Sequence, residues 1–263
     1  MSENAEIAEA AELLRTAQET RKACAPIRDL IGETDIDAAY KVQGINHEHA
    51  LASGRRQVGY KIGLTAKAVQ KQLGVDQPDY GVLYADMMLG DTSDIDTSQL
   101  IAPKVEAEIA FVLGRDIAHA DVTITELMDA IDHALPAIEV VDSRVKDWNI
   151  RITDTVADNA AGALCVLGTT PRKLSELDLR LCGMAMLNRG EPIATGAGLA
   201  CLGNPLNATL WLVQKMTSLG QSLRAGDVIM SGALGPMAPA KSGETYEANI
   251  SGLGSVRAVF AGS

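Results

Sequence analysis

The segment at residues 105–113, VEAEIAFVL, constrains the fold most strongly, because it alternates as a strand does and yet carries two acids. Successive side chains of a strand point to opposite faces, so Glu106 and Glu108 share one face with Ala110 and Val112, and the other face is wholly apolar. Because both faces carry apolar side chains, the pattern predicts a strand buried on both sides. A sheet face in contact with solvent is the competing interpretation, and the alternation alone favours neither.

A third acid lies in a segment of the same kind. In 136–142, PAIEVVD, Glu139 stands among isoleucine and valine, where a surface residue is less expected. Buried carboxylates lose hydration and repel one another, so each is costly alone. Together they can surround a hard divalent cation, which takes oxygen ligands. We therefore hypothesise a metal site formed by Glu106, Glu108 and Glu139, with positions left for water or substrate.

Lys61 is a second candidate, within the strand-like sequence GYKIG at 59–63. The flanking glycines permit close approach of a ligand to the backbone. A lysine in an apolar strand can bind a carboxylate, or act as an acid or base if its pKa is lowered. The alternative, which is the more frequent case for this pattern, is a lysine on an edge strand.

Asp79 lies in the segment 74–81, GVDQPDYG, which is rich in turn-forming residues. Most aspartates in such loops hydrogen-bond to their own backbone. The four histidines have no mutual spacing that suggests a metal site or a catalytic triad, and His133 is expected to end a helix. The sequence has no GxSxG motif to support a serine nucleophile.

Composition limits the classes of partner. The 263 residues include 34 acidic and 23 basic residues, a net charge of −11, without a cluster of lysine or arginine. An acidic surface repels phosphate backbones and anionic membranes, so we expect neither nucleic-acid nor membrane binding. No run reaches the roughly 18 apolar residues of a membrane span, and the acidic N-terminus does not resemble a signal peptide. The four cysteines are far apart without a CxxC pair, so we expect a cytoplasmic protein with reduced thiols.

Helical periodicity dominates the first third of the chain. We expect an opening helix, followed by a helix with a capping box at Thr34 and Asp37. A strand is predicted at 57–63, and Thr65 is predicted to cap a short helix that Gly74 closes.

The rest of the chain is predicted to contain both strands and helices. Besides the two acid-bearing strands, we expect a helix opened by Thr123 and Glu126, a hairpin turning at 188–190, and a helix beginning at Asn204-Pro205. Short strands are expected after that helix. The expected fold class is therefore α+β, and the lack of GxGxxG and GxxxxGK[ST] argues against a doubly wound nucleotide fold.

Several longer motifs resemble those of one enzyme family, the 2-keto-4-pentenoate (2-hydroxypenta-2,4-dienoate) hydratases. The motifs are GYKIGLTAKAVQKQLGVDQPDYGVLYADM, PKVEAEIAFVL, LPAIEVVDSRVKDWNIRITDTVADNA, and MSGALGP with GLGSV, in register over nearly the whole chain. This family belongs to the fumarylacetoacetate hydrolase-like superfamily. The resemblance implies a single catalytic domain with a mixed β-sandwich roll, in which a helical N-terminal region (1–55) packs on a β-rich body (56–263).

The resemblance also implies roles for site residues. It implies that the three acids named above hold Mg²⁺ or Mn²⁺, with Lys61 and Asp79 as the catalytic acid/base pair. Ser231, in MSGALG, is a weaker candidate for contacting the substrate carboxylate together with Lys61. Relatives commonly read ADNAS where this chain has ADNAA, so Ala161 departs from the family pattern.

The implied reaction is the addition of water to 2-hydroxypenta-2,4-dienoate, giving 4-hydroxy-2-oxopentanoate in aromatic meta-cleavage catabolism, by a cytoplasmic hydro-lyase. The resemblance further implies a homopentamer or homodecamer, and association with a pathway decarboxylase or aldolase. A 4-oxalocrotonate-type decarboxylase of the same superfamily is the alternative, because the same metal chelate stabilises the enolate left when CO₂ departs. A non-catalytic partner subunit is a third hypothesis; it predicts loss of the acidic ligands, and all three are present.

Overall fold

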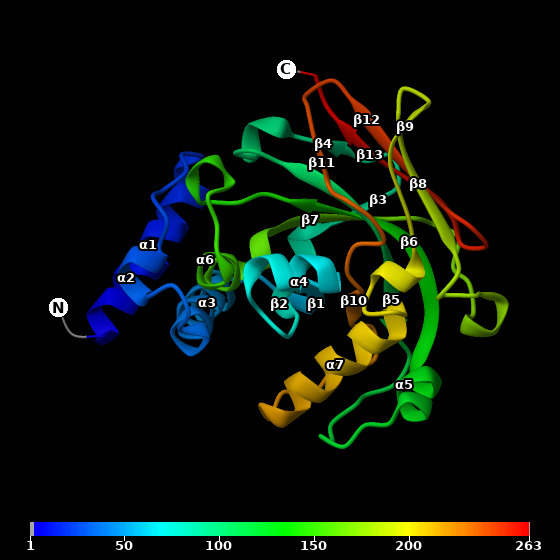
Figure 1. The fold of residues 1–263 in the computed structure, drawn as a ribbon, viewed down its shortest axis with the longest axis horizontal. Coiled ribbons are helices and arrows are strands. Elements are labelled where there is room, and N and C mark those ends of the chain that lie inside the picture. The colour runs from blue at the N-terminus through cyan, green and yellow to red at the C-terminus, as the bar shows by residue number, and fades with distance from the viewer. Residues whose placement is uncertain (1–2, 263) are drawn as a thin grey trace.

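The computed structural model describes residues 3–262, except for the side chains at positions 72 and 73. Three helices open the chain and lie together at one side of a β-rich body (Figure 1). They are α1 (Glu3–Thr20), α2 (Arg28–Ile31) and α3 (Ile36–Ala52). The later α-helices are α4 (Lys67–Leu73), α5 (Ile124–Ala130), α6 (Ile152–Ala157) and α7 (Pro205–Ser218). Within the described residues, no helix has the length and apolar character needed to cross a membrane.

The larger of two sheets follows the order β2-β1-β10-β5-β6-β7-β3, and β11 pairs with β5 beside this path. Its strands are β1 (Gln57–Gly63), β2 (Asp79–Tyr84), β3 (Met88–Gly90), β5 (Lys104–Leu113), β6 (Ile131–Val141), β7 (Gly162–Leu167), β10 (Val228–Met230) and β11 (Ala238–Pro239). The smaller sheet has the order β4-β13-β12-β8-β9. Its strands are β4 (Asp94–Ile95), β8 (Gly183–Asn188), β9 (Glu191–Ala197), β12 (Thr245–Ile250) and β13 (Gly254–Phe260). Both β12 and β13 contact β6, and the predicted α+β class is confirmed.

The antiparallel pair of β5 and β6 forms the centre of the larger sheet and bends strongly along its length (Figure 1). Apolar side chains from both faces of β5 are buried, among them Val105 and Ala110, each 0% exposed. The predicted burial of this strand on both sides is therefore confirmed. A bent, doubly covered sheet gives polar side chains on its concave face an environment with little water.

β6 begins earlier than the acid-bearing segment 136–142, at Ile131, so Pro136 lies inside the strand. Its carbonyl accepts a hydrogen bond from the Gly168 N–H, just beyond the end of β7. Proline is tolerated where a strand has no continuous partner on its amide side. His133 also lies in β6, so the expectation that it ends a helix is wrong; α5 already ends at Ala130.

Two helix starts are corrected in detail. The N-cap of α3 is Asp35, whose side chain accepts the Ala38 N–H at 2.9 Å, and not the predicted Thr34. Aspartate and threonine are both good N-caps, so composition alone does not choose between neighbouring positions. Thr65 does not cap α4, which starts after Ala66 without a side-chain cap.

Other element ends are as predicted. Thr123 forms a capping box with Glu126 at the start of α5, and Asn204 caps α7 through the Leu206 N–H. The strands β8 and β9 join in a two-residue turn between Asn188 and Glu191. In these places the local turn and capping signals predict the element ends correctly.

The N-terminal helices attach to the body through buried polar contacts as well as apolar packing. Arg28 forms an ion pair of 2.5 Å with the fully buried Asp154 of α6. The side-chain amide of Gln43 on α3 donates to the carbonyls of Tyr80 and Val156, each at 2.9 Å. Since Tyr80 belongs to β2 and Val156 to α6, this one amide links a helix to two elements of the body.

Candidate metal centre

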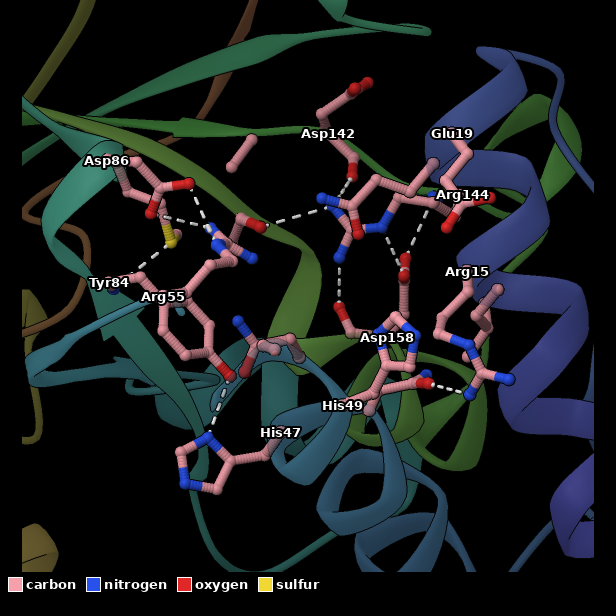
Figure 2. Close-up of a pocket in the computed structure, with 18 of the residues that line it drawn as sticks. Arg15, Glu19, His47, His49, Arg55, Tyr84, Asp86, Asp142, Arg144 and Asp158 are labelled. Carbon is pink, nitrogen blue, oxygen red and sulfur yellow. Dashed lines mark hydrogen bonds and ion pairs between the residues drawn. The ribbon is translucent and has the colours of Figure 1, made fainter. Parts of the chain in front are cut away.

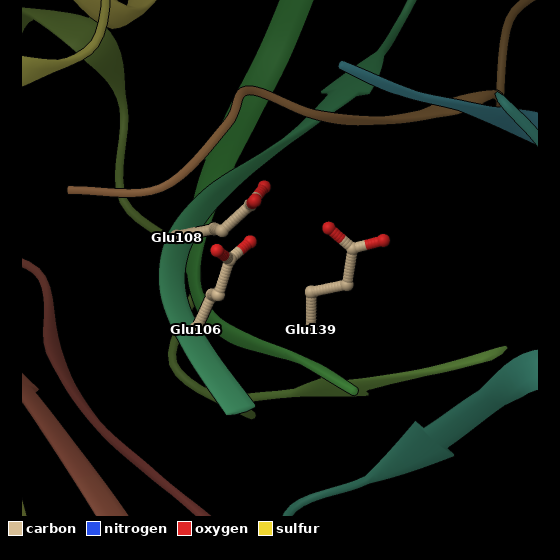
Figure 3. A group of neighbouring side chains, drawn as sticks. All are labelled: Glu106, Glu108 and Glu139. Carbon is tan, nitrogen blue, oxygen red and sulfur yellow. The ribbon is translucent and has the colours of Figure 1, made fainter. Parts of the chain in front are cut away.

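Three glutamates meet on the concave side of the larger sheet. Glu106 on β5 lies directly opposite Glu139 on β6, and Glu108 follows two residues later on the same face of β5. One carboxylate oxygen from each lies within 4.8 Å of the others, and Figure 3 shows the three groups gathered together. The register of two strands thus brings together the acids that the sequence analysis had grouped.

This cluster is poorly hydrated. Glu108 and Glu139 are 0% exposed, and Glu106 is partly exposed. The Gly232 N–H donates to Glu108 Oε2 at 2.9 Å. Among residues 3–262, neither oxygen of Glu139 nor Oε1 of Glu108 has a hydrogen-bond partner. The solvent-facing interpretation of this strand face is therefore wrong.

Burial and mutual repulsion shift the acidities of the cluster. Burial, together with the charge of Glu139, raises the pKa of Glu106 to about 7. Burial also raises the pKa of Glu108 well above its usual range, and the charges of Glu139 and Glu106 raise it further. Without a cation, protons have to neutralise part of this charge. A divalent ion fits the site, because it accepts several carboxylate oxygens and removes the repulsion.

Lys61 lies beside the cluster. Its strand, β1, is paired on both sides by β2 and β10, so the edge-strand interpretation is wrong. The side chain is buried, with Nζ 3.3 Å from Glu139 Oε1 and donating to the carbonyl oxygen of Ala160 at 2.8 Å. Burial lowers the pKa of Lys61, but the charges of Glu139 and Asp79 outweigh this effect and the pKa is raised. Lys61 is therefore held as a cation, and the lowered pKa on which its use as an acid or base was conditional is not found.

Asp79 completes the charged group. It is the first residue of β2 rather than part of a loop, and it is 1% exposed. In the part of the chain that the structure describes, neither of its carboxylate oxygens has a hydrogen-bond partner. Burial raises the pKa of Asp79, and the nearby Lys61 partly offsets the effect. A Cβ atom at Gly63 would lie 2.1 Å from Asp79 Oδ1 and 3.5 Å from Lys61 Nζ, so glycine leaves the room that both groups occupy.

Ser231 lies immediately after β10 and is fully buried. Its hydroxyl has no hydrogen-bond partner within residues 3–262. The next residue, Gly232, donates its N–H to Glu108, so Ser231 directly precedes a residue that contacts the carboxylate cluster. A buried hydroxyl without a partner is able to bind a polar group of a ligand.

Sequence reasoning missed the backbone groups of the site. The Gly232 N–H and the Ala160 carbonyl contact Glu108 and Lys61, but a backbone group has no residue-type signal. It also missed Cys165 on β7, which lies opposite Glu139 and is fully buried. Burial, and then the charges of Glu139 and Glu108, raise the pKa of the Cys165 thiol well above its usual range. Cys165 is therefore a neutral thiol in this site.

A family model for the fumarylacetoacetate (FAA) hydrolase C-terminal matches residues 44–261. The chain belongs to the fumarylacetoacetate hydrolase C-terminal family. The protein named TodF product hydratase from Pseudomonas putida is 54% identical over 255 residues, which are 97% of this chain and 95% of that protein. The 2-keto-4-pentenoate hydratase of Paraburkholderia xenovorans is 52% identical over 252 residues, which are 96% of this chain and 94% of the relative.

A solved structure is also similar to this member of the fumarylacetoacetate hydrolase family. It is 4-oxalocrotonate decarboxylase from Pseudomonas putida G7, complexed with magnesium and adipate. The TM-score is 0.92 at 33% sequence identity, and the match covers 99% of this chain and 98% of that chain. The fold therefore matches that of a solved decarboxylase, whereas the relatives with higher sequence identity are named hydratases.

A pocket of about 360 Å³ lies beside the site of this family member, and Asp79 is the site residue among those that line it. Asp79 lines it together with Tyr40 of α3 and with Trp211 and Lys215 of α7. The larger pocket, about 620 Å³, lies between the N-terminal helices and β7, and residues other than the three glutamates line it (Figure 2). Two arginines that line this pocket, Arg55 and Arg144, form ion pairs with carboxylates of the same chain, which neutralise their charges.

Proposed function

We propose that this protein is a hydro-lyase that adds water to 2-keto-4-pentenoate, the keto form of 2-hydroxypenta-2,4-dienoate, and forms 4-hydroxy-2-oxopentanoate. Relatives at 54% and 52% identity over nearly the whole chain are named hydratases. The structural observation that carries the proposal is the buried group of three glutamates with Lys61 3.3 Å from Glu139. Such a group can bind a metal and move protons in one small volume.

We propose that Glu106, Glu108 and Glu139 hold Mg²⁺ or Mn²⁺. The oxygens of Glu108 and Glu139 that lack hydrogen bonds support this, because the single ammonium group of Lys61 does not balance three carboxylates in this site. The similar decarboxylase structure contains magnesium. When bound, the ion supplies electrostatic stabilisation of the negative charge that develops on the substrate oxygens.

Lys61 and Asp79 are the proposed acid and base. The carboxylates around Lys61 raise its pKa, and a divalent ion held by the three glutamates would offset their charge. The ammonium group could then give a proton to C5 and take up the proton that the enol O–H of the dienoate loses. This step leaves an unsaturated 2-oxo acid. Asp79 has two unpartnered oxygens and a raised pKa, which suit it to accept a proton from the water that attacks C4 and to return a proton to C3.

Ser231 is the proposed contact for the substrate carboxylate, together with Lys61. Its buried hydroxyl has no partner among the described residues, and its neighbour Gly232 holds Glu108. A hydroxyl donor next to a cation provides both hydrogen bonding and charge for an anionic group. An acidic protein needs such local positive charge to bind an anion against its own net charge of −11.

Decarboxylation of a 4-oxalocrotonate-type substrate is the second candidate, favoured by the similar solved decarboxylase. The test supplies purified protein and Mg²⁺ with 2-hydroxypenta-2,4-dienoate, and separately with the dicarboxylate, and measures 4-hydroxy-2-oxopentanoate and CO₂. We expect hydration of the first substrate. Release of CO₂ from the dicarboxylate without hydration of the dienoate contradicts the proposal and supports the second candidate.

We also propose the finer features that the family resemblance implies. These are the mixed β-sandwich roll, a single catalytic domain with helical region 1–55 on body 56–263, and a homopentamer or homodecamer. The proposed setting is cytoplasmic meta-cleavage catabolism of aromatic compounds, in association with a pathway decarboxylase or aldolase. Sedimentation of the purified protein tests the oligomeric state, and co-purification with the pathway enzymes tests the association.

A further inference from the structure

A left-handed turn lies between α6 and β7, next to the metal centre. Its three residues, Asn159, Ala160 and Ala161, have φ angles of 53°, 50° and 55°. This backbone region is disfavoured for residues with a Cβ, and three in succession are rare; asparagine tolerates it better than alanine does. Such a turn persists only if surrounding contacts hold it in place.

The turn contacts Lys61 directly. The carbonyl oxygen of Ala160 accepts a hydrogen bond from Lys61 Nζ at 2.8 Å, and Glu139 Oε1 lies 3.3 Å from the same nitrogen. A lysine side chain has four rotatable bonds, so two acceptors restrict the ammonium group far more than burial alone. The left-handed backbone therefore presents a fixed neutral acceptor to the proposed proton donor.

One side chain ties the turn to β2. Asn159 Oδ1 accepts the Val82 N–H at 2.7 Å, and Asn159 Nδ2 donates to the Val82 carbonyl at 2.9 Å. The amide thus satisfies both backbone groups of one strand residue, as a neighbouring strand would. A Cβ atom at Gly81 would lie 2.4 Å from the Asn159 carbonyl oxygen, so glycine permits this close approach.

The other side of the turn is held by Arg144. Its Nη2 donates to the Asp158 carbonyl at 2.5 Å, and its Nη1 donates to the Gly162 carbonyl at 3.2 Å. Figure 2 shows Arg144 between Asp142 and Asp158, and its guanidinium also pairs with the Asp158 carboxylate. These bonds fix the two ends of the turn, whereas the Asn159 amide fixes its first residue against β2.

We propose that Asn159 is a positioning residue for the reaction: by pairing its amide with the backbone of Val82, it holds the left-handed turn so that the Ala160 carbonyl fixes Lys61 beside Glu139. The inference rests on the proposed function for its kinetic consequence. Its structural consequence, the position of Lys61, is independent of the substrate. Glutamine, alanine or serine at position 159 does not combine the left-handed preference with an amide of this reach.

The test compares Asn159→Ala and Asn159→Gly with a matched control, Gln43→Ala. Gln43 also has a buried amide that donates to backbone carbonyls of β2 and α6, and both of these carbonyls lie outside the turn. Glycine adopts the left-handed φ without strain, so Asn159→Gly removes the amide without straining the backbone and can be measured even if the alanine variant does not fold. For each protein we would measure kcat and KM for the dienoate, Mn²⁺ binding by calorimetry, and the crystal structure.

We expect both Asn159 variants to lose about tenfold or more in kcat, with KM and the Mn²⁺ dissociation constant within about threefold of wild type. In their crystal structures Lys61 Nζ leaves the Ala160 carbonyl. The control is expected to lose stability and keep kcat within about twofold. The inference is overturned if Asn159→Gly keeps the wild-type kcat, if the loss is confined to KM or Mn²⁺ binding, or if Lys61 does not move. If wild-type protein does not hydrate the dienoate, the proposed function fails, and the Lys61 position alone decides this inference.

Discussion

Lys61 Nζ lies 3.3 Å from Glu139 Oε1, and both side chains are almost fully buried. Removing one member of a buried ion pair leaves the other charge without compensation. We expect Lys61→Met to lower the free energy of unfolding of the metal-free protein by about 3 kcal/mol. We also expect a loss of kcat of about 10²–10⁴-fold in the metal-loaded protein, because a proposed proton donor is removed.

Chemical denaturation and dienoate turnover measure these two effects. The control is Lys173→Met, since Lys173 pairs with Asp132 on the surface and its loss is expected to cost under about 1 kcal/mol. Full activity of the Lys61 variant contradicts the assignment of Lys61 as the acid.

The proposed metal ligands are tested by Glu106→Gln combined with Glu108→Gln. The substitutions keep the size of the side chains but remove two of the three charges, so we expect Mn²⁺ affinity to fall about 100-fold or more and hydration to be lost. Calorimetric titration with Mn²⁺ measures the affinity. Glu12→Gln, at an exposed position of α1, is the control and is expected to bind Mn²⁺ as wild type does. A double variant with wild-type turnover excludes a metal-centred mechanism.

The stability of the metal-free protein is expected to depend on pH. Glu106 changes from an ordinary pKa of 4.5 to about 7 in the folded protein, whereas the unfolded chain releases this proton near 4.5. The folded form therefore binds more protons between these values, and its stability falls as pH rises from about 5 to about 8. Melting temperatures in the presence of a chelator measure this fall.

Excess Mn²⁺ is expected to abolish that trend, because the ion binds the deprotonated carboxylates and its affinity rises over the same pH range. Melting temperatures at each pH with and without Mn²⁺ give the comparison. An equal fall in stability with and without the metal contradicts metal binding by these carboxylates.

A substitution at Gly63 tests whether Asp79 needs the space that the missing side chain leaves. A Cβ atom at this position would lie 2.1 Å from Asp79 Oδ1, so we expect Gly63→Ala to displace the carboxylate and to reduce kcat about 10²-fold. Gly44→Ala is the control, because a Cβ at Gly44 in α3 has no described atom within 4 Å. That change is expected to leave activity intact and to stabilise the protein by about 0.5–1 kcal/mol. Steady-state kinetics and thermal unfolding of both variants give the result.

The sequence predicts the strand bearing Glu106 and Glu108 well, because alternation of side chains is a local property of a strand. It does not predict the register that sets Glu106 opposite Glu139, which depends on how β5 and β6 pair. The cost of burying three carboxylates led to the hypothesis that they meet, the family resemblance implied the same three ligands, and the roles of the individual residues stay predictions.

Elsewhere, tertiary contacts overrule local signals. Asp79 follows a turn-rich segment, yet it begins a buried strand because β2 pairs with β1 from this residue onward. Lys61 has the pattern of an edge-strand lysine, but β10, from the last sixth of the chain, covers the open side of β1. The Ala160 carbonyl that holds Lys61 depends on a left-handed turn of ordinary residues, and no turn signal of glycine or proline marks it.

The strand order β1-β10-β5 has a consequence for synthesis of the chain on the ribosome. The two strands that bear the glutamates can pair soon after residue 141 emerges, since they are neighbours in sequence and in space. Lys61 reaches its position only after β10 (Val228–Met230) has emerged and inserted between β1 and β5. In a nascent chain the three glutamates can therefore come together long before Lys61 is fixed beside them, so the complete group of charged residues forms only in the last part of translation.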